Sequence, residues 1–390
     1  MLIFSFSIEA AMMRFIHLIA VLCLFGSITV SHAEYIAVVD AGSSGTRLHV
    51  YSVEQQKVAE ITPEHASPMT PPFAQLTAEP EAVRQYVAEL LSPLVTASGT
   101  SNGIPLNLVH FYWYSTAGMR LVAPDRAEKL YTETKKVLQT YGFASVEAKT
   151  ITGKMEGVYG WLTINYLKHT LFSNPKQTYG VLDTGGASTE ITFAIKNATL
   201  IPPENAFKIE MGRHVIWLYT RSDLGLGHDL ARLQHTEEKS CFSKNYPLPN
   251  EQLATGNFML CKNSLVNLIK RVHKLNLPVM PESHRFYVLS TLYHLSTSAP
   301  FGFSTVLPLK SLAEKGKDVC DQDWKNLKLT YPDDSYLYSY CFGSAYYTAL
   351  LTRGYHFTPE SKFLIENEID GNQLDWTLGV AVYKSLRRIH

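Results

Sequence analysis

Two stretches of the chain share one order of apolar and small polar residues. In residues 36–46 an apolar run ends in Asp40, a turn of Gly, Ser and Thr follows, and a second apolar run begins. Residues 179–189 repeat this order around Asp183. Short apolar runs joined by a Gly-rich turn predict a β-hairpin. The repeat therefore predicts two related hairpins, and 390 residues suffice for two domains that each contain one.

Helical periodicity predicts further elements around and between the hairpins. The expected helices are Glu79–Val95, Pro124–Tyr141, Thr152–Leu167, Phe342–Thr352 and Asn372–Leu386, and Leu106–Tyr114 is an expected strand. Thr152 is the expected N-cap of its helix, with Glu156 in or near the first turn. Tyrosines at every second position of 336–340 resemble one face of a strand, and residues 197–260 read as an irregular insertion. Strands followed by helices, twice over, indicate an α/β class with mixed sheets.

The first 33 residues read as an export signal rather than as part of the fold. Arg14 precedes the apolar stretch Phe15–Val30, and Ser31-His32-Ala33 places small residues at the −3 and −1 positions of a cleavage site. The mature chain is expected to begin near Glu34, to be secreted or periplasmic, and to be a monomer. No later segment has the ~18 apolar residues that span a bilayer, so no transmembrane span is expected in the mature chain.

Cysteine usage agrees with export. Once Cys23 is removed with the signal, Cys241, Cys261, Cys320 and Cys341 remain. Four cysteines in an exported chain indicate two disulfides, for which three pairings exist. We favour the sequential pairs, Cys241–Cys261 and Cys320–Cys341, each contributing on the order of 3 kcal/mol to stability.

Charge and the absence of common phosphate motifs exclude several functions. Lys+Arg and Asp+Glu both number 35, so the net charge is zero and a surface that coats nucleic acid is not expected. The Walker A pattern is absent, because Met155 follows Gly153-Lys154 where a Ser or Thr is required. The kinase and dinucleotide Gly-rich loops are absent as well. Twin Asp-x-Gly hairpins are instead typical of the actin-like (ribonuclease H-like) arrangement, in which two related domains close on a nucleotide.

Five segments, in order, resemble the signature regions of the ecto-nucleoside triphosphate diphosphohydrolases, or apyrases. They are Val39–Arg47, Tyr114–Arg120, Thr152–Gly157, Asp183–Glu190 and Asp375–Gly379, with a weaker match at Ser222–Arg232. The resemblance is to a soluble, secreted member of the bacterial type, and it implies hydrolysis of NTP to NDP and of NDP to NMP. The nucleotide is then expected between domain I, residues 34–157 plus 364–390, and domain II, residues 158–363.

The resemblance also assigns roles to individual residues. Glu156 is the expected general base, and Ser188 would orient the attacking water. Asp40 and Asp183 would hold one divalent cation, Mg²⁺ or Ca²⁺, through its waters. The expected phosphate-binding residues are Ser43, Ser44, Gly45, Thr46, Arg47, Thr116, Ala117, Arg120, Gly185, Gly186 and Ala187.

One position departs from the family pattern: Glu190 stands where the family usually has Gln. A carboxyl group there could hydrogen-bond metal-bound water, change the metal preference, or be partly protonated at neutral pH. Tyr346 and Tyr347 are expected either to stack on the base or to pack in the core. Trp376 is expected to pack beneath the site, and the role of Asp375 is left open.

Three alternative functions compete with this hypothesis. An exported exopolyphosphatase would share the twin hairpins but needs a basic groove, and the zero net charge counts against it. A sugar kinase would need a sugar-binding Asp and cytosolic ATP. A non-catalytic nucleotide-binding module would have no use for a base such as Glu156. The leading hypothesis is therefore a metal-dependent hydrolase of nucleoside tri- and diphosphates (the ATP, ADP, GTP and UTP class), with no nucleic-acid partner.

Overall fold

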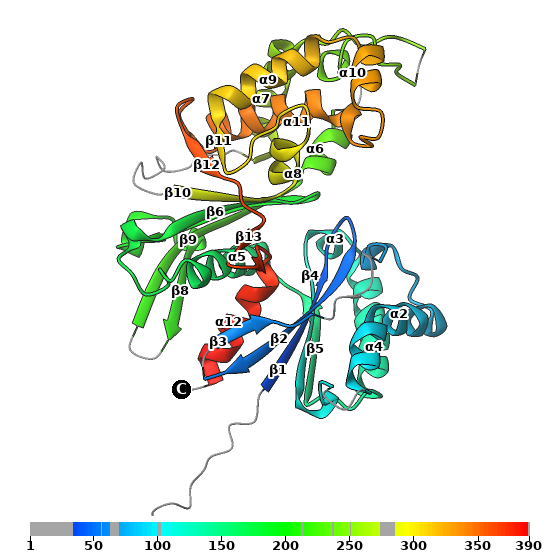
Figure 1. Cartoon of the computed structure of the whole chain (residues 1–390), viewed down its shortest axis with the longest axis vertical. Coiled ribbons are helices and arrows are strands. Elements are labelled where there is room, and N and C mark those ends of the chain that lie inside the picture. Colours follow the sequence, from blue (N-terminus) through cyan, green and yellow to red (C-terminus); the bar gives the residue numbers. More distant parts are fainter. Residues whose placement is uncertain are drawn as a thin grey trace, which may run out of the picture.

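The structure is a computed structural model that describes residues 34–55, 57–62, 70–99, 103–211, 214–235, 238–249, 251–273 and 285–388. The predicted signal peptide lies outside these residues. The described chain forms two lobes, each built on one large β-sheet (Figure 1). This mixed α/β architecture confirms the predicted fold class.

The first lobe contains a five-stranded sheet of order β3-β2-β1-β4-β5. Its strands are β1 (Glu34–Ala41), β2 (Thr46–Glu54), β3 (Lys57–Glu60), β4 (Val109–Ser115) and β5 (Ser145–Thr150), and its helices are α2 (Pro80–Ser98), α3 (Ala117–Arg120) and α4 (Pro124–Gln139). Strands β1 and β2 form the first predicted hairpin, and β1, β4 and β5 run parallel. The expected strand and helices of this lobe are therefore present, with ends shifted by a few residues.

Strand β1 is buried on both faces, which explains its continuous apolar run. Ala37 and Val39 pack in a core with α2 and α4. Ile36 and Val38 face a second core, which contains residues of α5 (Gly153–Leu167) and α12 (Trp376–Arg388). Successive strand side chains point to opposite faces, so the hairpin is held between two helical layers.

The second lobe contains a seven-stranded sheet of order β11-β12-β10-β6-β7-β9-β8. Its strands are β6 (Tyr179–Thr184), β7 (Ser188–Ile195), β8 (Ala206–Met211), β9 (His214–Leu224), β10 (Arg285–Ser290), β11 (Val306–Pro308) and β12 (Lys362–Leu364). Strands β6 and β7 form the second predicted hairpin. Strand β10 lies parallel to β6, so that Leu289 is opposite Asp183 and Ser290 is opposite Thr184.

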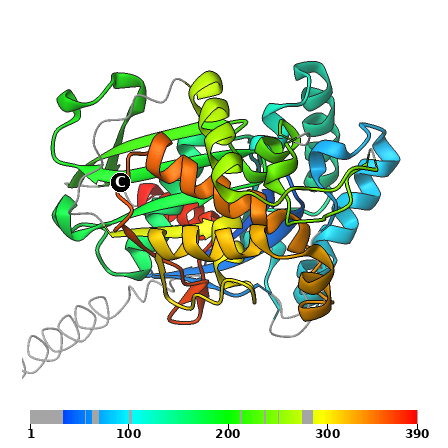
Figure 2. The ribbon, with the colours of Figure 1, turned by 90° about the horizontal axis from the view of Figure 1, so that it is seen from above.

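Helices cover the outer face of this second sheet. They are α6 (His228–Leu233), α7 (Phe258–His273), α8 (Thr291–Thr297), α9 (Leu309–Asp321), α10 (Trp324–Thr330) and α11 (Tyr340–Ala349). Seen from above, the gold and orange helices α9 and α11 run across the sheet (Figure 2). Two disulfides, Cys241–Cys261 and Cys320–Cys341, join segments of this helical layer, which confirms the predicted pairing.

Helices α5 and α12 lie between the two sheets (Figure 1). Helix α5 is apolar nearly all round, as expected for a helix with no solvent-facing side. The predicted N-cap is confirmed, because the Thr152 hydroxyl accepts a hydrogen bond from the Met155 amide at 3.3 Å. Glu156 then lies in the first turn, at the point where the two lobes meet.

Two local predictions were wrong. Tyr336–Tyr340 is a 3₁₀ turn leading into α11, because the Asp334 carboxylate accepts from the Tyr336 amide and the Tyr340 hydroxyl and holds a turn. The supposedly irregular residues 197–260 contain strands β8 and β9. Strands β13 (Glu368–Ile369) and β14 (Asn372–Gln373) form a small separate pair before α12. The domain boundaries near residues 157 and 364 stay a prediction. None of the described helices is long and apolar enough to cross a membrane.

Candidate active site

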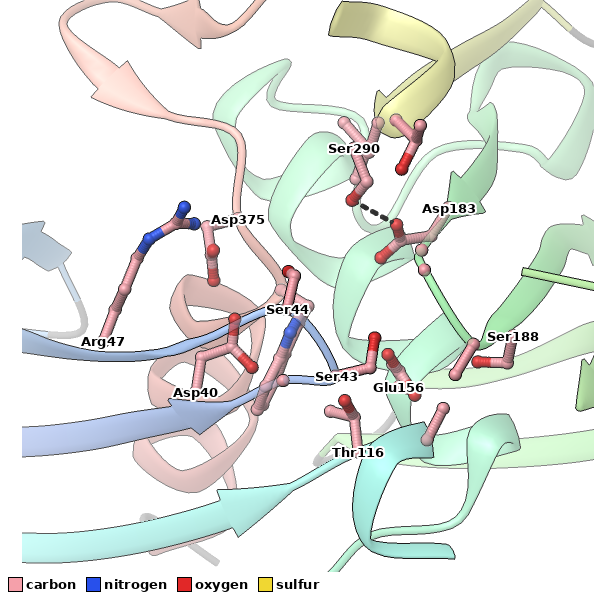
Figure 3. A pocket seen from close by; sticks show the side chains of 18 of the residues that line it. Asp40, Ser43, Ser44, Arg47, Thr116, Glu156, Asp183, Ser188, Ser290 and Asp375 are labelled. Carbon is pink, nitrogen blue, oxygen red and sulfur yellow. Dashed lines mark hydrogen bonds between the residues drawn. The ribbon is translucent and has the colours of Figure 1, made fainter. Parts of the chain in front are cut away.

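A polar cavity of about 170 Å³ lies where the tips of the two hairpins face each other (Figure 3). Most of the predicted site residues line it: Asp40, Ser43, Ser44, Arg47, Thr116, Ala117, Glu156, Asp183, Gly185, Gly186, Ala187 and Ser188. They come from both lobes and from α5 between them. The duplicated motif therefore forms one shared cavity.

The second tip directs backbone N–H groups toward this cavity. Its carbonyl oxygens accept hydrogen bonds from the first residues of α6 and the turn before it: Gly185 from His228, Gly186 from Asp229, and Ala187 from Gly225, at 2.8–2.9 Å. The C=O and N–H of a trans peptide point in opposite directions. The amides of the next residues along the tip therefore point away from α6, toward the cavity that the tip lines. This arrangement can bind an anion.

The first tip lies close against the second. A Cβ built on Gly186 would lie 2.8 Å from the Asp229 Oδ2 and 3.0 Å from the Ser43 Oγ, so a larger residue at this position would displace these side chains. Two of the predicted phosphate-binding residues of this first tip, Gly45 and Thr46, do not line the cavity. The Gly45 carbonyl accepts from the Gly42 amide, which closes the turn at 2.9 Å.

Thr46 also points away from the cavity, for a clear reason. Its backbone N–H and C=O both pair with Thr70, at 3.0 Å each, and its hydroxyl accepts from the Phe73 amide. The side chain is fully buried. Thr46 therefore anchors the hairpin to the rest of the first lobe, and its hydroxyl has no route to a phosphate in this conformation.

Arg120 lies behind the cavity rather than on its wall. Its guanidinium forms an ion pair with Glu156 and contacts Ser188, with Nη1 3.4 Å from the Ser188 Oγ. Nη1 also lies 3.7 Å from a carboxyl oxygen of Glu190. The predicted phosphate ligand thus contacts the predicted base directly.

Glu190 is buried one layer behind Ser188. Its Oε1 accepts hydrogen bonds from the hydroxyls of Ser188 and Ser222, at 2.6 and 2.7 Å. Burial raises the pKa of Glu190 well above its ordinary value, and the nearby carboxylates of Glu156 and Asp183 add to the effect. A protonated carboxyl group, like the amide of Gln, is uncharged and has both a donor and an acceptor. The departure from the family pattern therefore need not add a negative charge.

The carboxyl groups of the cavity repel one another. Burial, followed by the charge of Asp375, raises the pKa of Asp40 well above its ordinary value. Burial and the charge of Glu156 raise the pKa of Asp183 to about 7. Burial also raises the pKa of Glu156, although Arg120 opposes this shift. Such a cluster is stabilised by a cation in its midst.

The residues present fit a hydrated divalent cation. Among the described residues, Asp40 Oδ1 and Glu190 Oε2 are buried carboxyl oxygens with no hydrogen-bond partner. No three His, Cys, Asp or Glu side chains of the described segments form a direct metal cage. Mg²⁺ keeps several of its waters and needs few carboxylates, so these two oxygens without partners suit a cation that is held through its waters.

The structure does not bring Tyr346 and Tyr347 to the cavity. Both rings are fully buried in the core beneath α11, and the Tyr346 hydroxyl donates to the Leu226 carbonyl oxygen. Stacking on a base requires an exposed ring face, and neither ring has one. Of the two alternatives weighed for these residues, their positions match core packing.

Several residues that line the cavity had no role assigned from the sequence. Asp375 comes from the segment before α12, Ser290 ends strand β10, and Thr291 and His294 belong to helix α8. Asp375 belongs to the last signature segment and was named there, with its role left open. Ser290 ends an apolar strand and belongs to no motif, so no local signal marks it.

Comparison with known proteins identifies the family of the chain. The chain matches the profile of the GDA1/CD39 (nucleoside phosphatase) family over residues 27–388. It is 28% identical over 414 residues to mouse (Mus musculus) ectonucleoside triphosphate diphosphohydrolase 1, covering 89% of this chain and 80% of that protein. It is also 28% identical to probable apyrase 3 of Arabidopsis thaliana, covering 90% of this chain and 82% of that protein.

Solved structures agree at the level of the fold. A nucleoside triphosphate hydrolase from Neospora caninum superimposes with a TM-score of 0.69 at 15% identity, covering 98% of this chain and 97% of that one. A Ppx/GppA family member from Aquifex aeolicus gives a TM-score of 0.55 at 15% identity, covering 92% of this chain and 99% of that one. With a profile match that extends over nearly all of its length, the chain belongs to the GDA1/CD39 (nucleoside phosphatase) family.

Proposed function

We propose that this protein is an exported apyrase, which hydrolyses nucleoside triphosphates to diphosphates and diphosphates to monophosphates. The observation that carries the proposal is the meeting of two Asp-x-Gly hairpin tips and Glu156 in one cavity. Phosphoryl transfer requires charge neutralisation and alignment of the reactants more than covalent chemistry by the protein. The tip amides and the hydroxyls of Ser43 and Ser44 would bind the phosphate oxygens, and Arg47 would add positive charge.

The hydrogen bonds around Ser188 support its role in orienting water. The Ser188 hydroxyl donates its proton to Glu190, so its oxygen can accept a hydrogen bond. Arg120 contacts both Ser188 and Glu156, so these two acceptors are neighbours of one guanidinium group. A water molecule that donates one O–H to each of them directs a lone pair away from both, toward the phosphorus. Glu156 would then take the proton as the bond to phosphorus forms.

A divalent cation, Mg²⁺ or Ca²⁺, would neutralise phosphate charge in this cavity. Asp40 and Asp183 would hold it through its waters, one from each hairpin. Arg120 would act mainly by keeping Glu156 ionised in its buried position, since its charge lowers the pKa of that carboxyl group.

Export is part of the proposal. The two disulfides of the second lobe are typical of oxidising compartments. Fractionation of expressing cells, with determination of the N-terminal residue of the mature protein, tests it. A start near Glu34 in the exported fraction is expected, and retention of residues 1–33 in the cytosol would contradict it.

The function is tested by phosphate release from ATP, ADP and inorganic polyphosphate, with Mg²⁺, with Ca²⁺ and with EDTA. We expect metal-dependent release from both nucleotides. In Glu156→Gln, release should fall by roughly a hundred- to ten-thousandfold, while binding of a non-hydrolysable nucleotide is retained. Glu133→Gln, an equivalent change on the outer helix α4, is the control and should be fully active.

Each other outcome has a clear meaning. Turnover that survives Glu156→Gln removes this residue as the base. Release from polyphosphate alone would replace the proposal with an exopolyphosphatase. No release from any of the three would indicate a binding module.

A further inference from the structure

Ser290 has a backbone conformation that serine rarely adopts. It is the last residue of strand β10, directly before helix α8, with φ 62° and ψ −131°. These angles are close to the first central position of a type II′ turn, which glycine dominates because it lacks a Cβ. Non-glycine residues held in such regions are strained, and they persist where the surroundings require them.

Ser290 also does not cap the helix that follows it, although serine often does so at this position. It is the N-cap residue of α8, where a serine side chain ordinarily accepts a hydrogen bond from a backbone amide of the first turn. Its side chain makes no such bond. The Ser290 hydroxyl instead donates to Oδ1 of Asp183, at 2.6 Å, across the cavity wall (Figure 3).

Thr184 takes over the capping of α8. Its hydroxyl accepts from the Leu292 amide at 2.9 Å and donates to the Leu289 carbonyl oxygen at 2.8 Å. Thr184 is fully buried and follows Asp183 in strand β6. The residue beside the carboxylate therefore holds the turn in place, which leaves the Ser290 hydroxyl free to reach Asp183.

We propose that Ser290 is a positioning residue, which fixes the Asp183 carboxylate so that its second oxygen is presented to the hydrated cation. This inference rests on the proposed function of the cavity. A carboxylate at the end of a strand can rotate about its Cβ–Cγ bond, and a single short hydrogen bond to one oxygen stops that rotation. The strained backbone of Ser290 then persists because it places the hydroxyl within hydrogen-bonding distance of Asp183.

Two substitutions separate the hydroxyl from the strain. Ser290→Ala removes the hydroxyl and keeps a Cβ in the strained conformation, whereas Ser290→Gly removes both. Cation binding to the nucleotide-free protein is measured by calorimetry with MgCl₂ and with CaCl₂, and thermal unfolding is recorded in EDTA. Ser298→Ala, at the other end of α8, removes a hydroxyl that donates to the Leu295 carbonyl oxygen and serves as the control.

Both Ser290 variants should bind the cation roughly ten- to hundredfold more weakly, as expected when a hydrogen bond to a charged group is lost. In EDTA, however, Ser290→Gly should unfold at a higher temperature than Ser290→Ala, because only glycine relieves the strain. A purely structural role would instead make cation affinity unchanged in both. The control should match the wild type in cation affinity.

Three results would overturn the inference. They are unchanged cation affinity in both Ser290 variants, wild-type affinity in Ser290→Gly alone, and a wild-type protein that binds no divalent cation. If the wild type binds cations but hydrolyses no nucleotide, the proposed function fails while the binding comparison still decides the role of Ser290.

Discussion

The two hairpin tips have the same backbone but different support. A Cβ on Gly42 would lie 3.1 Å from the Gly45 carbonyl oxygen, and a Cβ on Gly185 would lie 3.3 Å from the Ser188 carbonyl oxygen. In each copy the glycine faces the carbonyl three residues on, and the aspartate precedes it by two. The turn itself is therefore duplicated almost unchanged.

The aspartates differ in what surrounds them. Asp40 is paired across the hairpin with Arg47, and the charges of His49 and Arg47 both lower its pKa against the larger effect of burial. Asp183 instead accepts a hydrogen bond from the Ser290 hydroxyl. The first lobe supports its carboxylate with positive charge, and the second supports it with a hydroxyl. Duplication thus accounts for the shared turn, while the surroundings of Asp40 and Asp183 differ because residues outside the repeat differ.

The largest effect is expected from the aspartates themselves. Asp40→Asn and Asp183→Asn should each lower the rate of nucleotide hydrolysis by roughly a thousandfold or more, because metal assistance contributes several kcal/mol to catalysis. The measurement is phosphate release at saturating Mg²⁺. A large loss in only one of the two variants would show that the tips are not equivalent in the reaction.

His49 should affect stability in a pH-dependent way. Although burial lowers it, the carboxylates of Asp375 and Glu60 raise the pKa of His49 to about 9. The imidazole Nδ1 lies 3.0 Å from the Glu60 Oε1. Because the folded-state pKa exceeds the ordinary 6.5, the stabilisation is complete below pH 6.5 and is lost as the pH rises through 9.

His49→Gln should therefore lose about 3 kcal/mol of pH-dependent stability at pH 6, and this part of the loss should vanish above pH 9. Urea unfolding at several pH values measures it. His110→Gln, on the neighbouring strand β4, is the matched control, because His110 hydrogen-bonds the Ser145 hydroxyl. A His49→Gln loss that is the same at pH 6 and pH 9 would show that packing, not charge, supports the first tip.

The smallest effect concerns the helix between the tips. Thr152→Ala removes the N-cap of α5 and should cost about 1 kcal/mol. Hydrolysis should fall severalfold, because Glu156 lies in the turn that this cap holds. Asp323→Ala removes the N-cap of α10, a helix that contributes no residue to the cavity lining. It should cost as much stability without changing the rate of hydrolysis. Equal rates of hydrolysis in both variants would show that the Thr152 cap does not affect the position of Glu156.

Much of the site could be predicted because its signals are local. The Asp-x-Gly turns identify Asp40 and Asp183 within a few residues of sequence, and the Thr152 cap predicts where Glu156 lies. The cysteine pairs are close in sequence, separated by 20 and 21 residues. Each of these features needs only neighbouring residues to be recognised.

The remaining features depend on contacts between distant segments. Ser290 reaches Asp183 across 107 positions of the sequence, through the parallel pairing of β10 with β6. The burial of Tyr346 and Tyr347 depends on how α11 packs in the helical layer, since tyrosine suits both a core and a binding surface. Side-chain periodicity in a single segment contains no information of this kind.

The central claim is that the two tips share one cation, and calorimetry on four proteins tests it most directly. The proteins are the wild type, Asp40→Asn, Asp183→Asn and the double variant, each titrated with MgCl₂ in the absence of nucleotide. We predict one cation per wild-type chain, a strong loss of affinity in each single variant, and little further loss in the double variant, because the two carboxylates act on the same ion. Two bound cations, or losses that simply add in the double variant, would contradict the shared site.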